Sequence, residues 1–199
     1  MYHEMTFAGF GGQGILYAAR LLAYAAMFED LHVAWIPSYG PEMRGGAATA
    51  SVIISDKDID SLVVTNPHTA AFMNQPSLDK YEGGVRAGGI IFFNSSLISH
   101  APERADVSVF PVPANETAYQ LGDDRAANLV MLGAAVQITQ VVPLDAVLDA
   151  FDRISKDKNT ALHRVDRAAL LKGAELGTES VARRGKGGDI ATKAPPAAG

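Results

Sequence analysis

The first third of the chain alternates short apolar runs with one long helical pattern. Residues 4–9 and 31–36 are apolar runs that predict strands. Residues 13–28 lie between them and carry apolar side chains at near-helical spacing, at Ile15, Ala18, Ala19, Leu22 and Ala26. This spacing predicts a helix. Residues 49–56 and 61–65 then predict two more strands on either side of a polar turn.

Helices gather in the second half of the chain. Further strands are predicted at 68–74, 88–96 and 105–113. Helices are predicted at 77–83, 115–122, 124–139, 143–155 and 159–176. Their predicted N-caps include Ser77, Asn115 and Asn159. The early alternation favours a three-layer α/β/α sandwich with a mostly parallel or mixed central sheet. We expect a single α/β domain over residues 1–177. Residues 178–199 are small, polar and rich in Gly and Pro, which predicts a flexible C-terminal tail.

A glycine-rich turn joins the first predicted strand to the first predicted helix. Four of its six residues are glycine, Gly9, Gly11, Gly12 and Gly14, and Gln13 lies among them. This Rossmann-like βα turn brings backbone N–H groups and a helix dipole to one point, which is typical of an anion site.

Three interpretations of this turn stay open: a nicotinamide dinucleotide site, a site for another anion or a partner, and simple close packing. The dinucleotide site needs an acid at the end of the second strand, and Ser38 and Tyr39 stand there instead. The glycines can also serve only a tight turn and close helix–strand packing.

A second glycine-rich loop follows the second predicted strand. Its candidate ligand- or partner-binding residues are Ser38, Tyr39, Gly40, Glu42, Arg44, Gly45 and Gly46. If the first two strands are parallel neighbours, this loop lies beside the first turn at the carboxyl edge of the sheet. Arg44 would then offer a guanidinium to a phosphate or a carboxylate. Alternatively, Arg44 pairs with Glu42 and the glycines only turn the chain.

Composition narrows the possible functions. The 199 residues are 48% hydrophobic and 20% charged, which suits one globular core. The chain has no cysteine, which excludes disulfides, cysteine nucleophiles and thiolate-bound zinc or iron–sulfur clusters on it. Its five histidines are scattered and predict no metal site. Residues 183–199 carry a net charge of +3, and residues 1–182 carry a net charge of −8. The acidic main part of the chain argues against binding to nucleic acid. No apolar run predicts a membrane span and no basic segment predicts a signal peptide, so we expect a cytoplasmic protein.

Four segments together resemble a known protein family. They are "GFGGQGI" in the first turn, "SYGPEMRGG" at 38–46, "VPANETAYQLGDDRAANLVMLGA" at 112–134 and "KNTALHRVDRAALLKG" at 158–173. Their order and spacing are similar to those of the gamma subunit of 2-oxoacid:ferredoxin oxidoreductases. The second segment looks most similar to the 2-oxoglutarate synthase branch, and the pyruvate, ketoisovalerate and indolepyruvate branches have related loops. In the third segment, Asn128, Leu132 and Gly133 suit close packing.

The resemblance implies a non-catalytic subunit of a larger enzyme. Such complexes decarboxylate a 2-oxoacid oxidatively, transfer the acyl group to coenzyme A and reduce ferredoxin. Thiamine diphosphate, Mg and iron–sulfur clusters would lie on alpha, beta and ferredoxin-like delta subunits, and no cofactor on this chain. The chain would contribute to assembly and to the coenzyme A channel. The alternative is a free-standing Rossmann-like nucleotide-binding protein or enzyme.

Overall fold

The computed structural model describes residues 1–39, 47–155 and 160–186, with the side chains of 184–186 left out. The elements in chain order are β1 (Tyr2–Phe10), α1 (Ile15–Phe28), β2 (His32–Tyr39), β3 (Ala47–Ser55), β4 (Thr69–Phe72), α2 (Gln75–Tyr81), β5 (Ile90–Asn94), β6 (Ser108–Val112), α3 (Ala114–Gln120), α4 (Ala127–Thr139), α5 (Leu144–Ile154) and α6 (Ala161–Lys186). Short 3-10 helices lie at Glu82–Gly84 and Asp124–Ala126.

One mixed sheet of six strands organises these elements, in the order β2-β3-β1-β4-β5-β6. β1, β4, β5 and β6 are parallel, whereas β3 is antiparallel to both β1 and β2. The mixed sheet is confirmed. The expected neighbourhood of the first two strands is wrong, because β3 folds back as a hairpin and inserts between them.

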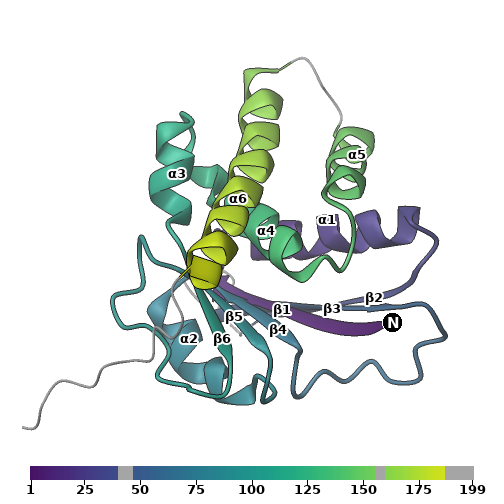
Figure 1. Ribbon diagram of the computed structural model, residues 1–199. Helices are drawn as coiled ribbons and strands as arrows, with labels where there is room; N and C mark the ends of the chain where they lie inside the picture. The colour runs from purple at the N-terminus through teal and green to yellow at the C-terminus, as the bar shows by residue number, and fades with distance from the viewer. Residues whose placement is uncertain (40–46, 156–159, 187–199) are drawn as a thin grey trace, which may run out of the picture.

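The two faces of the sheet are covered unequally (Figure 1). Helices α1, α3, α4, α5 and α6 lie on one side, and α2 lies on the other. Helices therefore flank both faces, as expected for an α/β sandwich, but the second layer is thin. The parallel strand β4 is buried along its whole length. Along β3, buried positions alternate with half-buried ones from Ala47 to Val52, because an antiparallel strand can leave one face in contact with solvent.

The larger core lies between the sheet and the helices on the first side. Met5, Phe7 and Val52 from the sheet contribute to it, together with Leu22 of α1 and Phe151 of α5. Helix α4 is buried on nearly all sides, because it packs mainly against α6 and also against α1 and α3. A smaller core on the other side joins Phe72, Leu78 and Phe93 beneath α2.

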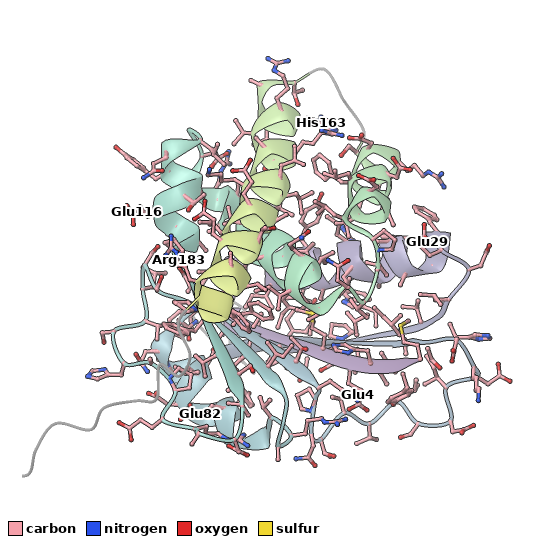
Figure 2. The ribbon with its side chains drawn as sticks, viewed as in Figure 1. Glu4, Glu29, Glu82, Glu116, His163 and Arg183 are labelled. Atoms are coloured by element: carbon pink, nitrogen blue, oxygen red, sulfur yellow. The ribbon has the colours of Figure 1, made fainter. Side chains whose placement is uncertain are left out.

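Helices α5 and α6 are joined through a histidine. His163 on α6 stacks on Phe151 at a ring-centroid distance of 4.7 Å, and its Nε2 lies 3.1 Å from Asp152 Oδ1 (Figure 2). The side chain is 9% exposed. His163 therefore has a structural role, as its isolated position in the sequence suggests.

Three details of the predicted helices differ from the structure. The cap of α2 is Asn74, whose Oδ1 accepts from Ser77 N at 2.9 Å, and Ser77 itself is buried one turn further on. Asn115 lies inside α3, whose N-cap position is Pro113. Asn159 lies outside the described residues.

Two predicted segments also differ. Residues 61–65 form no strand, although their sequence is β-prone. Helix α6 continues to Lys186, past the predicted start of the tail at 178. Gly177 does not end the helix, because it packs against α4: a Cβ there would lie 3.0 Å from Ala134 O.

Candidate functional site

The glycine turn after β1 has the backbone shape that its glycines allow. Gly12 and Gly14 have φ angles of 101° and 71°, in the region that side chains disfavour. Gly14 is the N-cap of α1 and no side chain caps that helix end. The first N–H groups of α1 therefore have no capping side chain, which leaves donors and the positive end of the helix dipole at the turn.

Close packing is a second reason for glycine in this turn. A Cβ at Gly9 would lie 2.4 Å from Ile15 Cδ1, and one at Gly14 would lie 2.4 Å from Asn128 Nδ2. Asn128 Nδ2 donates to Gly14 O at 2.9 Å, so α4 is joined directly to the turn. The packing interpretation therefore accounts for Gly9, and partly for Gly14. Asn128 and Leu132 are buried, in agreement with the packing role predicted for them.

Gln13 uses its side chain to hold the turn in place. Its Oε1 accepts from Phe10 N at 2.7 Å and from Asn74 Nδ2 at 2.8 Å, and its Nε2 lies 3.3 Å from Met73 O. These bonds connect the end of β1 to the end of β4. The amide of Gln13 is therefore engaged within the chain, and backbone groups remain the donors that the turn offers to a ligand.

Three asparagines that the sequence prediction missed continue this network along the carboxyl edge of the sheet. Asn74 caps α2 and reaches Gln13. Asn94 is fully buried, donates to Asn115 Oδ1 at 2.7 Å and accepts from Ala114 N at 3.2 Å. Asn74 follows β4 and Asn94 ends β5, so an asparagine at the end of these two neighbouring parallel strands was the available signal.

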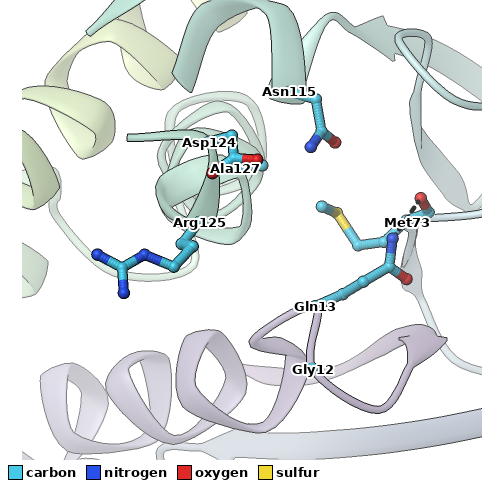
Figure 3. A pocket seen from close by; sticks show the side chains of 7 residues that line it. All are labelled: Gly12, Gln13, Met73, Asn115, Asp124, Arg125 and Ala127. Atoms are coloured by element: carbon cyan, nitrogen blue, oxygen red, sulfur yellow. Dashed lines mark hydrogen bonds between the residues drawn. The ribbon is translucent and has the colours of Figure 1, made fainter. Parts of the chain in front are cut away.

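The turn borders a pocket of about 170 Å³ (Figure 3). Its lining residues are Gly12, Gln13, Met73, Asn115, Asp124, Arg125 and Ala127. A second pocket of about 280 Å³ shares Gly12 and Arg125 and extends to Tyr17 of α1 and Asp166 of α6. The turn thus faces two adjoining hollows, one bordered by α3 and the other by α1 and α6, and both reach the start of α4.

The charges around these pockets largely cancel. Arg125 forms a two-pronged pair with Asp123, with nitrogen–oxygen distances of 2.9 Å and 2.7 Å, and these hydrogen bonds lower the pKa of Asp123. Burial raises the pKa of Asp166, and the charge of Asp123 raises it further. Because the arginine that lines these two pockets already has a carboxylate partner, their described lining provides no free cation for a strong anion site.

The second glycine-rich loop begins and ends beside this turn. Gly9 and Tyr39 both pair with Ala48, on opposite sides of β3, and Phe10 pairs with Ala47. Both loops therefore start from one edge of the sheet, although β1 and β2 are not neighbours. Ser38 and Tyr39 are exposed at the end of β2. Gly40, Glu42, Arg44, Gly45 and Gly46 lie outside the described residues.

The acid expected in a dinucleotide site must be sought on another strand. The parallel neighbour of β1 is β4, which is followed by Met73, Asn74 and Gln75. None of these is a carboxylate, and Asn74 is engaged with Gln13 and α2. Among the residues described, no group of three or more metal-ligating side chains could hold an ion, and no helix has the length and apolar character of a membrane span.

Comparison with known proteins gives consistent matches to one family. Residues 4–176 match the model of the pyruvate ferredoxin/flavodoxin oxidoreductase family. The chain is 34% identical to the 2-oxoglutarate synthase subunit KorC of Methanocaldococcus jannaschii, over 90% of this chain and 96% of that protein. It is 41% identical over 135 residues to the ketoisovalerate oxidoreductase subunit VorA of Methanothermobacter marburgensis, but it spans only 28% of that longer protein.

The fold is also found in a crystal structure. The keto/oxoacid ferredoxin oxidoreductase gamma subunit from Geobacter sulfurreducens is 31% identical, with a TM-score of 0.80, and the match covers 90% of this chain and 98% of that one. These matches confirm the resemblance found in the four sequence segments. The chain belongs to the pyruvate ferredoxin/flavodoxin oxidoreductase family.

Proposed function

We propose that this chain is the gamma subunit of a multi-subunit 2-oxoacid:ferredoxin oxidoreductase. The complex would decarboxylate a 2-oxoacid oxidatively, transfer the acyl group to coenzyme A and reduce ferredoxin in the cytoplasm. The observation that carries this proposal is the match to KorC along nearly the whole of both chains. That match covers 90% of this chain and 96% of KorC, which supports a role like that of the KorC subunit.

The chemistry would take place on the other subunits. The sequence has no cysteine to ligate an iron–sulfur cluster. Its glycine turn is followed by Ile15 and Leu16, so the lysine of a phosphate-binding P-loop is missing. We assign thiamine diphosphate, Mg and the clusters to alpha, beta and ferredoxin-like delta subunits. This chain contributes to their assembly and to the channel for coenzyme A.

The contact with those partners involves the two glycine-rich loops. The proposed residues are Gly9, Gly11, Gly12, Gln13, Gly14, Ser38, Tyr39, Gly40, Glu42, Arg44, Gly45 and Gly46. The strand register supports one shared surface, because both loops leave the sheet next to Ala47 and Ala48. Arg125 borders the glycine turn but is already paired with Asp123. We therefore assign Arg44, in the second loop, to the binding of an anion, which is either the pyrophosphate of coenzyme A or a carboxylate of a partner subunit.

We assign 2-oxoglutarate as the substrate of the complex. The full-length likeness to KorC supports it. Ketoisovalerate is the second candidate, because identity to VorA is higher over the shorter shared region. The side chains that recognise the substrate would lie on other subunits. An assay of the whole complex therefore decides between 2-oxoglutarate and ketoisovalerate.

A free-standing nucleotide-binding protein is the rival function. It is disfavoured because no carboxylate follows β4. The described residues at the turn also form no pair of a nucleophile and a base that would support an enzyme of this kind. Their side chains are amides, and Gln13 binds Asn74 while Asn94 binds Asn115.

The test is purification of the chain from its native source, followed by identification of the chains that accompany it. The purified complex is assayed for reduction of a viologen dye with coenzyme A and either 2-oxoglutarate or ketoisovalerate. We expect alpha, beta and delta subunits and faster reduction with 2-oxoglutarate. Recovery of this chain alone, or dye reduction by this chain alone, would overturn the proposal.

A further inference from the structure

An apolar pair lies exposed on the segment between β3 and β4. Leu62 is 60% exposed and Val63 is 70% exposed. Single exposed apolar side chains are ordinary in a folded domain, but two adjacent ones with little contact to the core are unusual. The segment runs on the side of the sheet away from α1 (Figure 1), and Val64 and Thr65 border a hollow there together with Thr49 and Ser51 of β3.

The backbone of this segment is also unpaired. No backbone–backbone hydrogen bond joins residues 58–65 to another part of the described chain. The one local bond is from Val63 N to Ser61 Oγ, at 3.2 Å. The sequence of residues 61–65 is nevertheless typical of a strand. A β-prone, apolar segment with free N–H and C=O groups is a template for contact with another chain.

Carboxylates lie directly before the apolar pair. Asp56, Asp58 and Asp60 line an open depression of about 480 Å³ together with Tyr2, which is 45% exposed. Lys57 lies there as well, and the amino group of Met1 pairs with Asp56. Asp58 is 92% exposed and its carboxylate is 3.4 Å from His32, at the start of β2. Asp58 and Asp60 are therefore the carboxylates open to a partner.

We propose that residues 58–63 form a docking segment for another subunit of the complex, one that presents Lys or Arg side chains beside an apolar patch. The proposal rests on the proposed function. Charge selects this partner over a second copy of the chain. A twofold contact centred on this short segment would bring Asp58 and Asp60 of the two copies close together near the axis, and residues 1–182 carry a net charge of −8.

The test uses the complex with the full-length chain. In one variant, Leu62→Ser and Val63→Ser remove the apolar contact while the core stays intact. In a second, Asp58→Lys and Asp60→Lys reverse the charge. The matched controls are Met27→Ser, an apolar side chain 48% exposed on α1, and Asp149→Lys, an exposed carboxylate on α5. The dissociation constant between this chain and the remaining subunits is measured at low and high salt.

We expect both double variants to weaken assembly by about tenfold or more, with the controls close to the parent. The parent should lose affinity as salt rises, and the charge-reversed variant should lose less. Assembly of both double variants at the parent's affinity would overturn the proposal, as would a homodimer of the isolated chain that Leu62→Ser and Val63→Ser dissociate. Failure of the parent chain to bind those subunits at all would instead contradict the proposed function.

Discussion

At the scale of single residues, the amide side chains of the site are used within the chain. Gln13 is bound to Phe10, Asn74 and Met73, and Asn128 is bound to Gly14. These half-buried or buried amides hold strand ends and helix starts in fixed positions, because leaving a buried amide unpaired costs about 1–3 kcal/mol. We propose that recognition of a charged ligand or partner depends on the backbone of the turn and on Arg44.

Arg44→Ala tests that dependence. A loop arginine contributes little to a core, so we expect the free energy of unfolding of the isolated chain to change by no more than about 0.5 kcal/mol. In the assembled enzyme, the same variant should weaken assembly or raise the Michaelis constant for coenzyme A by about tenfold or more. Lys172→Ala is the control, since Lys172 lies on α6 and pairs with Glu175. If the Arg44→Ala complex assembles normally and uses coenzyme A as the parent does, the anion-binding role of the loops is contradicted. The glycines would then serve only tight turns and close packing.

His3 gives a second prediction, on stability at low pH. The pKa of His3 is lowered from 6.5 to about 4, mainly by burial and also by the nearby charges of His68 and Arg86. The unfolded chain therefore takes up this proton at a higher pH than the folded chain. Stability is fully present above about pH 6.5 and falls between pH 6.5 and 4, by at most roughly 3 kcal/mol from this group.

Urea unfolding at pH 7.5 and pH 5 measures this effect. The parent should lose stability between the two values, and His3→Gln should lose less, because Gln takes up no proton. His68 also has a lowered pKa, so part of the loss will remain. An equal loss in the parent and in His3→Gln would contradict the prediction.

At the scale of elements, the crossing of α4 and α6 has no room for side chains between the helices. A Cβ at Gly133 would lie 2.1 Å from Leu170 O, and a Cβ at Gly173 would lie 2.0 Å from Val130 O. Backbone atoms cannot move aside as a flexible side chain can, so each glycine sets the separation of the two helices. The close packing predicted for Gly133 is confirmed.

Gly173→Ala should therefore destabilise the domain, by roughly 1–3 kcal/mol. The sign of the change in unfolding free energy is informative, because alanine in place of glycine at an open helix position stabilises a helix by about 1 kcal/mol. Chemical denaturation of the isolated chain measures the change. Gly83→Ala is the matched control, since no atom lies within 4 Å of its added Cβ, and it should change stability by less than about 0.5 kcal/mol. Stabilisation by Gly173→Ala would mean that the helices separate at little cost.

At the scale of the whole molecule, the parallel and antiparallel halves of the sheet have different surroundings. The parallel half, β1-β4-β5-β6, ends in the amide network and faces the pockets. The antiparallel half, β2-β3, is covered by α1 on one face, and β2 ends and β3 begins beside the glycine turn. A dinucleotide fold would instead place a second βαβ unit beside β1, with an acid at the end of its strand.

NAD and NADP should accordingly bind the isolated chain no more tightly than about 1 mM, or about −4 kcal/mol. The reason is the end of β4, where Met73, Asn74 and Gln75 offer no carboxylate to a ribose. Calorimetric titration of either nucleotide into the chain measures the affinity. A micromolar dissociation constant would revive the free-standing nucleotide-binding protein.

The sequence by itself determined the local elements, because their signals are local. Apolar spacing predicted α1, α4 and α5, and apolar runs predicted β1, β3 and β5; glycines marked the turn, and the four segments identified the family. The weakest predictions fell at caps and ends. Ser77 and Asn74 are both good caps, and only the packing of α2 decided between them. Residues 61–65 are β-prone, but a strand needs a neighbour, which the fold does not supply there.

Only the tertiary structure decided which segments meet. Spacing along the chain does not show that β3 inserts between β1 and β2, because pairing depends on contacts across the sheet. The same holds for Asn94 and Asn115, since no local pattern marks a hydrogen bond between distant elements. The α6 helix runs past Gly177 for the same reason: its contact with α4 stabilises a stretch whose own composition predicts a tail.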